Sequence, residues 1–324
     1  MVKRIQLFIF TLLISLATNF CFGQQRPQYT QYMVNSYLLN PAVTGINDNK
    51  IIKSGYRAQW VGFEGAPQTY FISGHAPINK IDDISARRIK KKLNHHGIGG
   101  YIFSDATGPT SRSGIYISYA YHLSLTKKVK ASMGTFVGML QNKIDIDKIS
   151  TADPDNAILT GLQAKIMPDI SLGTWIYSDK AFFGLVVSQV IQNKFFITDP
   201  TNLTTYSKLR SHFFIHAGYN YQINREWFLV PSVLYKFVTP VYSHFDINIK
   251  LKYKQMAWAG LSYRQDDAIA GMIGFTDTKS GFNISYSYDL TTSKIRYHSA
   301  GSHEVIIGLN IAGKGKVLCP DDYW

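Results

Sequence analysis

Apolar and polar residues alternate with a period of two through long stretches of this chain. In residues 245–253 every second side chain is apolar, and Asp, Asn or Lys stands between them. Residues 115–123 and 282–290 show the same period, with Tyr and Ser prominent. Because successive side chains of a strand point to opposite faces, each segment is predicted to be a strand with one apolar and one polar face.

Fourteen segments of this kind occur, and most are separated by short connections that carry turn residues. Most have about the 9–11 residues that cross a bilayer as a tilted strand. No helix-length periodic segment lies between them, and an even strand number is typical of a single-chain outer-membrane barrel. The sequence therefore predicts an all-β fold, a transmembrane antiparallel β-barrel of 14 strands. The predicted strands are 51–60, 68–77, 96–106, 112–123, 128–141, 168–178, 180–190, 207–222, 226–239, 243–254, 256–265, 268–276, 281–290 and 302–312.

A soluble secreted β-sandwich or propeller is the rival interpretation, because it also has alternating strands. Its apolar faces form a core and tend toward Val, Leu and Ile, whereas the apolar faces here are rich in the chain's 21 Tyr and 19 Phe. Aromatic side chains suit the interfacial girdles of a membrane barrel. A barrel of this strand number encloses more space than one layer of side chains fills, so loops or a terminal segment are expected inside it.

The first 23 residues have the features of an export signal. Lys3 and Arg4 precede an apolar core, and small residues lead to a cleavage site after Gly23. A transmembrane anchor is the alternative, but the apolar run is short and Gln6 interrupts it. We expect the mature chain to begin at Gln24, in the outer membrane, with Cys319 as its only cysteine and thus no internal disulfide.

Loop lengths predict an orientation. With both termini in the periplasm, the long connections 142–167, 191–206 and 291–301 lie outside, and most periplasmic turns are short. Residues 78–95 are the exception, a long periplasmic segment rich in Arg and Lys. It is either a solvated turn or a docking site for an acidic periplasmic partner.

Charge and motifs exclude several classes of function. The net charge of +13 becomes +11 when Lys3 and Arg4 are lost, but the basic residues form no clustered face, so nucleic acid is not an expected partner. Lipopolysaccharide and acidic proteins are more natural counterparts for such a barrel. Residues 308–315 resemble a phosphate-binding loop but lack its Ser or Thr and the following helix. We expect no enzyme activity, no catalytic residues, no metal site and no cofactor.

Three stretches carry more than period-two alternation. They are 28–45, 56–70 leading to 75–77, and 97–110 together with 285–289 and 301–304. The second stretch contains the specific block Arg-x-Gln-Trp-x-Gly-x-x-Gly-Ala-Pro. Together they resemble the PorP/SprF family, outer-membrane barrels of the type IX secretion and gliding machinery of Bacteroidota. The resemblance covers nearly all of the mature chain but not the loops 142–167 and 191–206.

The resemblance implies a non-enzymatic barrel that binds or anchors a secreted partner, an adhesin-type protein with its own C-terminal sorting domain. It also implies contact with other type IX secretion components and with the lipid bilayer. The alternative that period and composition leave open is an outer-membrane channel or small-molecule transporter. The expected organisation is a signal peptide, a plug-like N-terminal segment, the barrel and a basic tail, at residues 1–23, 24–50, 51–312 and 313–324.

The motif residues also have physical interpretations. Asn40, Pro41 and Gly45 are expected to form a turn before the first strand. Arg57 and Gln59 share the lumen face, where Arg57 has carboxylates such as Glu64 within reach. A loop with two glycines and one proline follows at 61–67. Two roles are open for this block: direct contact with a secreted partner, or folding and closing the barrel without such a contact. The candidate site residues are Asn40, Pro41, Gly45, Arg57, Gln59, Trp60 at the membrane boundary, Gly62, Gly65, Pro67 and Cys319, an unpaired thiol or an intermolecular bond.

Overall fold

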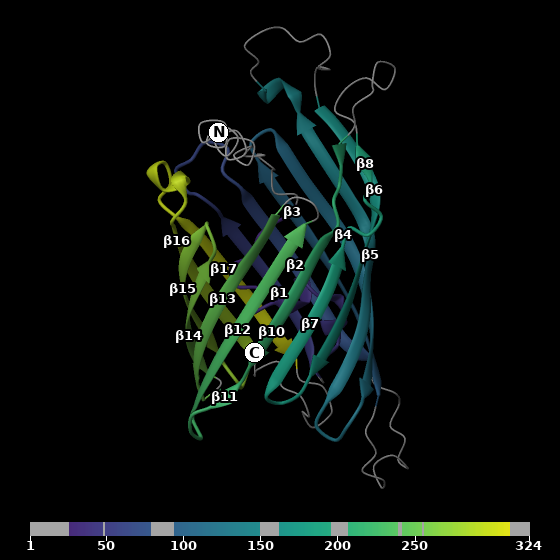
Figure 1. Ribbon diagram of the computed structural model, residues 1–324, viewed down its shortest axis with the longest axis vertical. Coiled ribbons are helices and arrows are strands. Elements are labelled where there is room, and N and C mark those ends of the chain that lie inside the picture. The colour runs from purple at the N-terminus through teal and green to yellow at the C-terminus, as the bar shows by residue number, and fades with distance from the viewer. Residues whose placement is uncertain are drawn as a thin grey trace, which may run out of the picture.

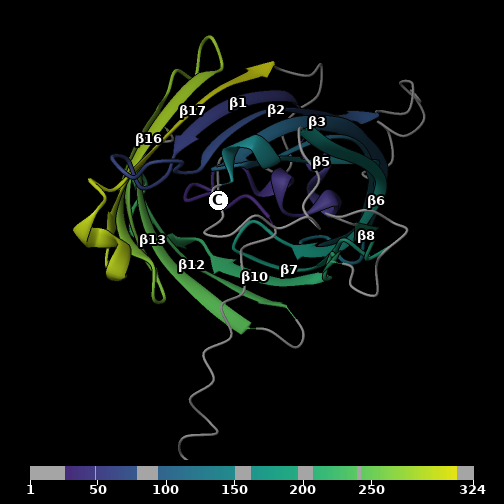
Figure 2. The ribbon, with the colours of Figure 1, turned by 90° about the horizontal axis from the view of Figure 1, so that it is seen from above.

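The computed structural model describes residues 26–47, 49–78, 94–149, 162–195, 207–238, 242–254 and 256–311. Fourteen antiparallel strands close into one barrel, seen from the side in Figure 1 and along its axis in Figure 2. They are β1 (Lys50–Ala58), β2 (Gln68–Ile78), β3 (His95–Thr107), β4 (Thr110–Ser124), β5 (Lys130–Asp145), β6 (Leu162–Tyr177), β7 (Ala181–Ser188), β10 (His212–Tyr219), β12 (Trp227–Val238), β13 (Tyr242–Tyr253), β14 (Ala257–Arg264), β15 (Ala268–Thr276), β16 (Phe282–Thr291) and β17 (Ser302–Ile311).

The first and last strands meet to close the sheet. β1 pairs with β17 from Lys50↔Ile311 to Ala58↔His303, and β10 pairs directly with β12. Short pieces accompany this ladder: β11 (Tyr221–Gln222) pairs with β12, and β8 (Lys194–Phe195) with β9 (Ser207–Lys208). Closure leaves the main ladder no free edge, which a membrane barrel requires because lipid offers no hydrogen bonds.

Burial along the strands is inverted relative to a soluble protein. In β13 the buried positions are Asp246, Asn248, Lys250 and Lys252, whereas Ile247 and Ile249 are about half exposed. The same inversion places Ile, Leu and Tyr outward on β2, β4, β15 and β16. An apolar exterior on strands whose polar side chains point inward is the arrangement that a bilayer favours, so the predicted membrane barrel is confirmed.

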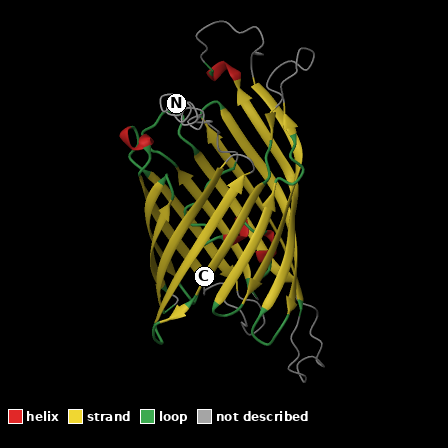
Figure 3. Cartoon of the chain, viewed as in Figure 1, coloured by secondary structure: helices red, strands yellow, loops and turns green. Residues whose placement is uncertain are grey.

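Helices contribute little to the fold. The described residues contain only short 3-10 helices, some in the lumen and others beyond the strand ends (Figure 3). Among the described residues no helix has the length and apolar character needed to span a membrane. We call the rim where β1 begins and β17 ends the periplasmic rim, following the orientation predicted from loop lengths, and the opposite one the outer rim.

All fourteen predicted strands are present, and the predicted bounds differ from the structure at some strand ends. β5 and β6 pair from Lys130↔Tyr177 to Asp145↔Leu162, well beyond the predicted limits of 141 and 168. The loop expected at 142–167 is correspondingly shorter, and Pro168 lies inside β6 opposite Met139. Proline normally marks the first residue or the edge of a strand because it cannot donate to the ladder, which explains the misplaced boundary.

Residues 26–47, which we call the plug segment, lie inside the barrel (Figure 2). The segment begins near the outer rim, where the Gln28 side chain reaches Asp267 in the β14–β15 turn. It descends through η1 (Ser36–Leu38) and η2 (Pro41–Val43) and reaches the periplasmic rim just before β1. Its backbone therefore crosses the lumen from one end to the other.

The plug segment packs against apolar side chains that the inner wall contributes. Tyr37, Leu38, Val43 and Ile46 form one buried cluster with aromatic side chains from β2 to β7, including Phe71, Phe136 and Trp175. Tyr32 and Met33 form a second cluster with Val186, Phe214, Leu234 and Met272. Most of these contacts lie on the β2–β12 side of the lumen.

Glycines on the inner wall make room for the plug segment. A Cβ on Gly134 would lie 2.4 Å from Pro41 O, and one on Gly173 would lie 2.0 Å from Asn40 Oδ1. Gly97 is the tightest against backbone, since its Cβ would lie 2.0 Å from Thr44 O. Gly45 itself has φ +67°, a conformation that side chains disfavour.

Gly97→Ala is therefore expected to lower the free energy of unfolding by about 1–3 kcal/mol, the usual cost of overpacking. The matched control is Gly271→Ala, because a Cβ at Gly271 meets no atom within 4 Å. Urea unfolding of the barrel in lipid vesicles, followed by tryptophan fluorescence, measures both. Equal unfolding midpoints for the two variants would contradict the close approach of the plug segment to β3.

Candidate functional site in the barrel lumen

A buried ionic cluster lies in the outer half of the lumen. Arg57 Nη2 on β1 is 2.8 Å from Asp289 Oδ2 on β16, and Arg57 Nη1 is 3.2 Å from Glu304 Oε2 on β17. The three side chains are at most 2% exposed. The pairs therefore join three strands next to the closing β1–β17 seam.

A second arginine extends the cluster along β13 and β14. Arg264 Nη1 lies 3.0 Å from Asp267 Oδ2 and 3.5 Å from Asp289 Oδ2, while its Nε lies 3.6 Å from Asp246 Oδ2. Two arginines thus meet four carboxylates, with Asp289 shared between the arginines. The excess of acceptors leaves carboxylate oxygens available for neutral donors.

The plug segment provides those donors. The backbone N–H groups of Thr30 and Gln31 donate to the two oxygens of Glu304 at 2.8 and 3.1 Å. The Thr30 hydroxyl donates to Asp289 at 2.6 Å and accepts from Arg57 at 2.6 Å and from Arg264 at 3.1 Å. Charge-assisted bonds of this kind are the strong ones, so Thr30 fastens the plug segment to the wall.

Histidines hold the other end of the plug segment near the periplasmic rim. Gly45 N–H donates to His75 Nδ1 at 3.0 Å, and His95 Nε2 lies 2.9 Å from Gly45 O. His122 Nε2 lies 2.8 Å from Thr44 O, and its ring stacks on His95 at 4.3 Å. The segment is thus fixed at two levels of the barrel, by carboxylates near one rim and by imidazoles near the other.

The sequence-predicted residues before β1 have local structural roles. Asn40 caps η2 by accepting from Ala42 N–H at 2.9 Å, and its amide also donates to Thr174 O at 3.0 Å. Pro41 begins that helix, where its missing N–H costs nothing. Together with Gly45 they form the expected turn, and all are buried inside the barrel.

Arg57 and Gln59 face the lumen as expected, but the suggested partner of Arg57 is wrong. Glu64 is exposed in the rim loop, and the cation pairs with Asp289 and Glu304 instead. Gln59 is 5% exposed, and its backbone N–H donates to Pro67 O at 2.9 Å. Whether either residue contacts a partner protein stays a prediction.

Residues 60–67 form a shaped loop on the outer rim. Trp60 has φ +51°, and the glycines Gly62 and Gly65 have φ +93° and +70°. Val61 N–H donates to Gly301 O at 2.8 Å, and Gly108 N–H donates to Gly65 O at 2.8 Å. This rim loop is therefore tied to the connections on both sides of it.

Other predicted features lie outside the described residues. These are Cys319 and the basic tail, the cleavage site after Gly23, and most of the basic segment 78–95. Within the described ranges no group of three His, Cys, Asp or Glu side chains is arranged to hold a metal ion.

Comparison with known proteins gives a family. Residues 21–309 match the family described as "Type IX secretion system membrane protein PorP/SprF". No curated protein matches the chain. The family is one of secretion-system membrane proteins and not of enzymes.

Solved barrels share the fold at low sequence identity. A Pseudomonas aeruginosa FadL homologue is 11% identical with a TM-score of 0.50, covering 89% of this chain and 94% of its own. The CymD monoaromatic hydrocarbon channel is also 11% identical with a TM-score of 0.50, covering 90% of this chain and 94% of its own. These likenesses show the barrel fold alone.

Arg57→Met is expected to lower the free energy of unfolding by about 3–5 kcal/mol, because Asp289 and Glu304 would stay buried without their cation. The control is Lys148→Met, which removes an ion pair to Asp145 whose lysine is 67% exposed, and which is expected to cost less than about 1 kcal/mol. Chemical unfolding in lipid vesicles compares the two. A loss of stability for Arg57→Met no larger than that of the control would refute the stabilising role of the ion pairs that Arg57 forms with Asp289 and Glu304.

Proposed function

The chain belongs to the PorP/SprF family of type IX secretion system membrane proteins, and on that premise we propose that it is a non-enzymatic docking barrel of the outer membrane. It binds or anchors a secreted partner, an adhesin-type protein with its own C-terminal sorting domain. Other type IX secretion components and the surrounding lipopolysaccharide are its remaining contacts.

The occupied lumen is the observation that most favours docking over open diffusion. The plug segment packs into two buried apolar clusters and is tied to the wall by Thr30 and Gln31. A transporter needs a continuous path for its substrate, whereas a docking barrel works with its lumen filled. The plug segment therefore supports a function carried by the rims.

The rim loop is the proposed contact for the secreted partner. Val61 and Phe63 are 37% and 48% exposed on the loop, and Tyr297 in the neighbouring connection is 72% exposed. The hydrogen bonds to Gly301 and Gly108 hold this surface in place. A pre-organised aromatic surface loses little conformational entropy on binding, which favours recognition.

A channel or small-molecule transporter remains the second candidate, and the inner face of β16 favours it. The hydroxyls of Ser285, Ser287 and Thr291 are buried without a hydrogen-bond partner in the described chain. Such a polar column suits water beside the plug segment. CymD, one of the barrels with this fold, is a monoaromatic hydrocarbon channel by description.

Affinity purification of the tagged protein from mildly solubilised membranes tests the docking function. We expect one large secreted protein or other type IX components to co-purify, and Phe63→Ser to reduce the recovered partner by about tenfold, the effect of losing a binding hot spot. The control is Leu125→Ser, which changes a 52% exposed apolar residue in the β4–β5 turn at the opposite rim. Recovery of the barrel alone from cells that express the machinery would contradict docking.

Conductance separates the two candidates. In planar bilayers the wild-type barrel is expected to be silent, because the plug segment crosses the lumen and is fixed to its wall near both rims. A steady open conductance that saturates with a small solute would favour the transporter. Arg57→Met, which weakens the plug segment's attachment, is expected to produce intermittent openings.

A further inference from the structure

Strand β6 extends beyond the closed ladder at the outer rim (Figure 1). It has 16 residues, whereas its neighbour β7 has 8. β5 pairs with β6 along its whole length, but β7 pairs with it only over residues 172–177. Among the described residues no strand pairs with the other edge of β6 between 162 and 171. At about 3.3 Å per residue, this one-sided stretch is roughly 30 Å long.

Alternate residues of β6 direct their backbone N–H and C=O groups to this edge. In an antiparallel sheet successive residues hydrogen bond to opposite neighbours. Ile170 O accepts from Val190 N–H at 3.0 Å, on the β7 side, so the even-numbered residues of β6 face away from β5. Pro168 belongs to this set, and its missing N–H therefore costs the β5–β6 ladder nothing. The backbone groups of Ala164 and Ile166 point the same way.

The connection after β7 covers only the part of the edge that is nearer the membrane. There Asn193 Nδ2 donates to Pro168 O at 2.6 Å, next to the bond from Val190. The described chain gives the edge-facing backbone groups of Ala164 and Ile166 no hydrogen-bond partner, and both residues are exposed. Because open strand edges do not occur in hydrocarbon, this part of the edge lies in water beyond the membrane.

The side chains beside the edge define what an added strand would carry. Lys165 points to the lumen side, where its Nζ donates to Lys194 O at 3.0 Å. Ile166 points outward and is 62% exposed, and Met139 of β5 is 53% exposed on the same face. A strand that pairs with this edge thus places every second side chain beside an apolar surface, where aromatic and β-branched residues pack well.

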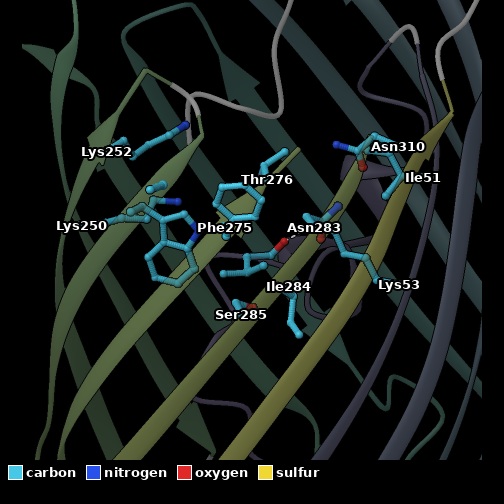
Figure 4. Close-up of a pocket in the computed structure, with 13 residues that line it drawn as sticks. Ile51, Lys53, Lys250, Lys252, Phe275, Thr276, Asn283, Ile284, Ser285 and Asn310 are labelled. Carbon is cyan, nitrogen blue, oxygen red and sulfur yellow. Dashed lines mark hydrogen bonds between the residues drawn. The ribbon is translucent and has the colours of Figure 1, made fainter. Parts of the chain in front are cut away.

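The cavity in the lumen wall is too small for such a segment. It lies near the periplasmic rim, between Val34 of the plug segment and strands β1 and β13 to β17 (Figure 4). Its volume of about 70 Å³ corresponds to about two water molecules at roughly 30 Å³ each. Water beside the Ser285 hydroxyl suits this space, and an extended polypeptide does not enter it.

We propose that the edge of β6 at Ala164 and Ile166 accepts an extended segment of the secreted partner by strand addition. The segment exchanges backbone hydrogen bonds with both residues and continues the wall outside the membrane. In this mode of recognition the backbone bonds supply affinity and alternate side chains supply specificity. The inference rests on the proposed function, and it adds the kind of structure that the partner presents.

Ile166→Pro removes one donor from the edge and leaves the β5–β6 ladder intact, as Pro168 does two residues away. We expect this variant to keep the wild-type unfolding midpoint and to recover about tenfold less partner, the upper range of what one backbone hydrogen bond contributes. Ile166→Ala is the matched control, because it shortens the side chain and keeps the N–H group. Ala164→Pro is a second variant that tests the edge if Ile166→Pro fails to fold.

A probe peptide tests the edge without the partner. A capped peptide of alternating threonine and valine, with a glutamate at each end for solubility, is added to the purified full chain in detergent. Hydrogen exchange of β6 fragments is followed by mass spectrometry, with residues 172–177, paired on both sides, as the internal reference. We expect the peptide to slow exchange in residues 162–168 of wild type and Ile166→Ala, and Ile166→Pro to require about tenfold more peptide.

The outcomes separate this inference from the proposed function. Partner recovery that falls in Ile166→Pro and persists in Ile166→Ala supports strand addition. Equal recovery with wild type and Ile166→Pro would overturn it and leave docking intact. If the wild type recovers no partner, docking is contradicted, and unchanged exchange in residues 162–168 with the peptide would overturn the edge as well. A doubled barrel mass that Ile166→Pro abolishes would assign the edge to a second copy of the chain instead.

Discussion

The ion pairs of Arg57 with Asp289 and Glu304 are the interaction on which the rest of the lumen depends. They stand beside the β1–β17 seam, where the two ends of the sheet meet. Glu304 accepts both from Arg57 and from the backbone of the plug segment. The Glu304 carboxylate therefore binds both the barrel wall and the plug segment. Its burial is favourable only while Arg57 and the backbone N–H groups of the plug segment are both present as donors.

The lumen has two sides with different linings. On the β2 to β12 side the inner wall contributes most of the buried aromatic and aliphatic side chains, and the plug segment completes two apolar clusters with them. On the β13 to β17 side the inner face keeps mainly serines, asparagines and charged residues. Apolar residues on the outer face of the wall point toward lipid.

Much of this fold is predictable because period-two alternation is a local property of the sequence. The strands, their number and the lumen-facing side of Arg57 followed from it. The partners of Arg57 did not, because Asp289 and Glu304 lie 232 and 247 residues away in sequence. Arg264 and Thr30 were missed for the same reason. Two signals were available: Asp289 and Glu304 fall in the polar phase of their strands, and they lie in the stretches 285–289 and 301–304 that resemble the family. Both mark these carboxylates, but neither names a partner.

The attachment of the plug segment to the last strand has a consequence for biogenesis. Thr30 and Gln31 can form their hydrogen bonds to Glu304 only once β17 is in place beside β1, because that carboxylate belongs to the final strand of the sheet. The outer end of the segment that is synthesised before every strand therefore gains this attachment last. Its other end contacts histidines of β2, β3 and β4, which precede β17 in the chain. A barrel whose seam is still open during membrane insertion thus lacks the link from Thr30 and Gln31 to Glu304.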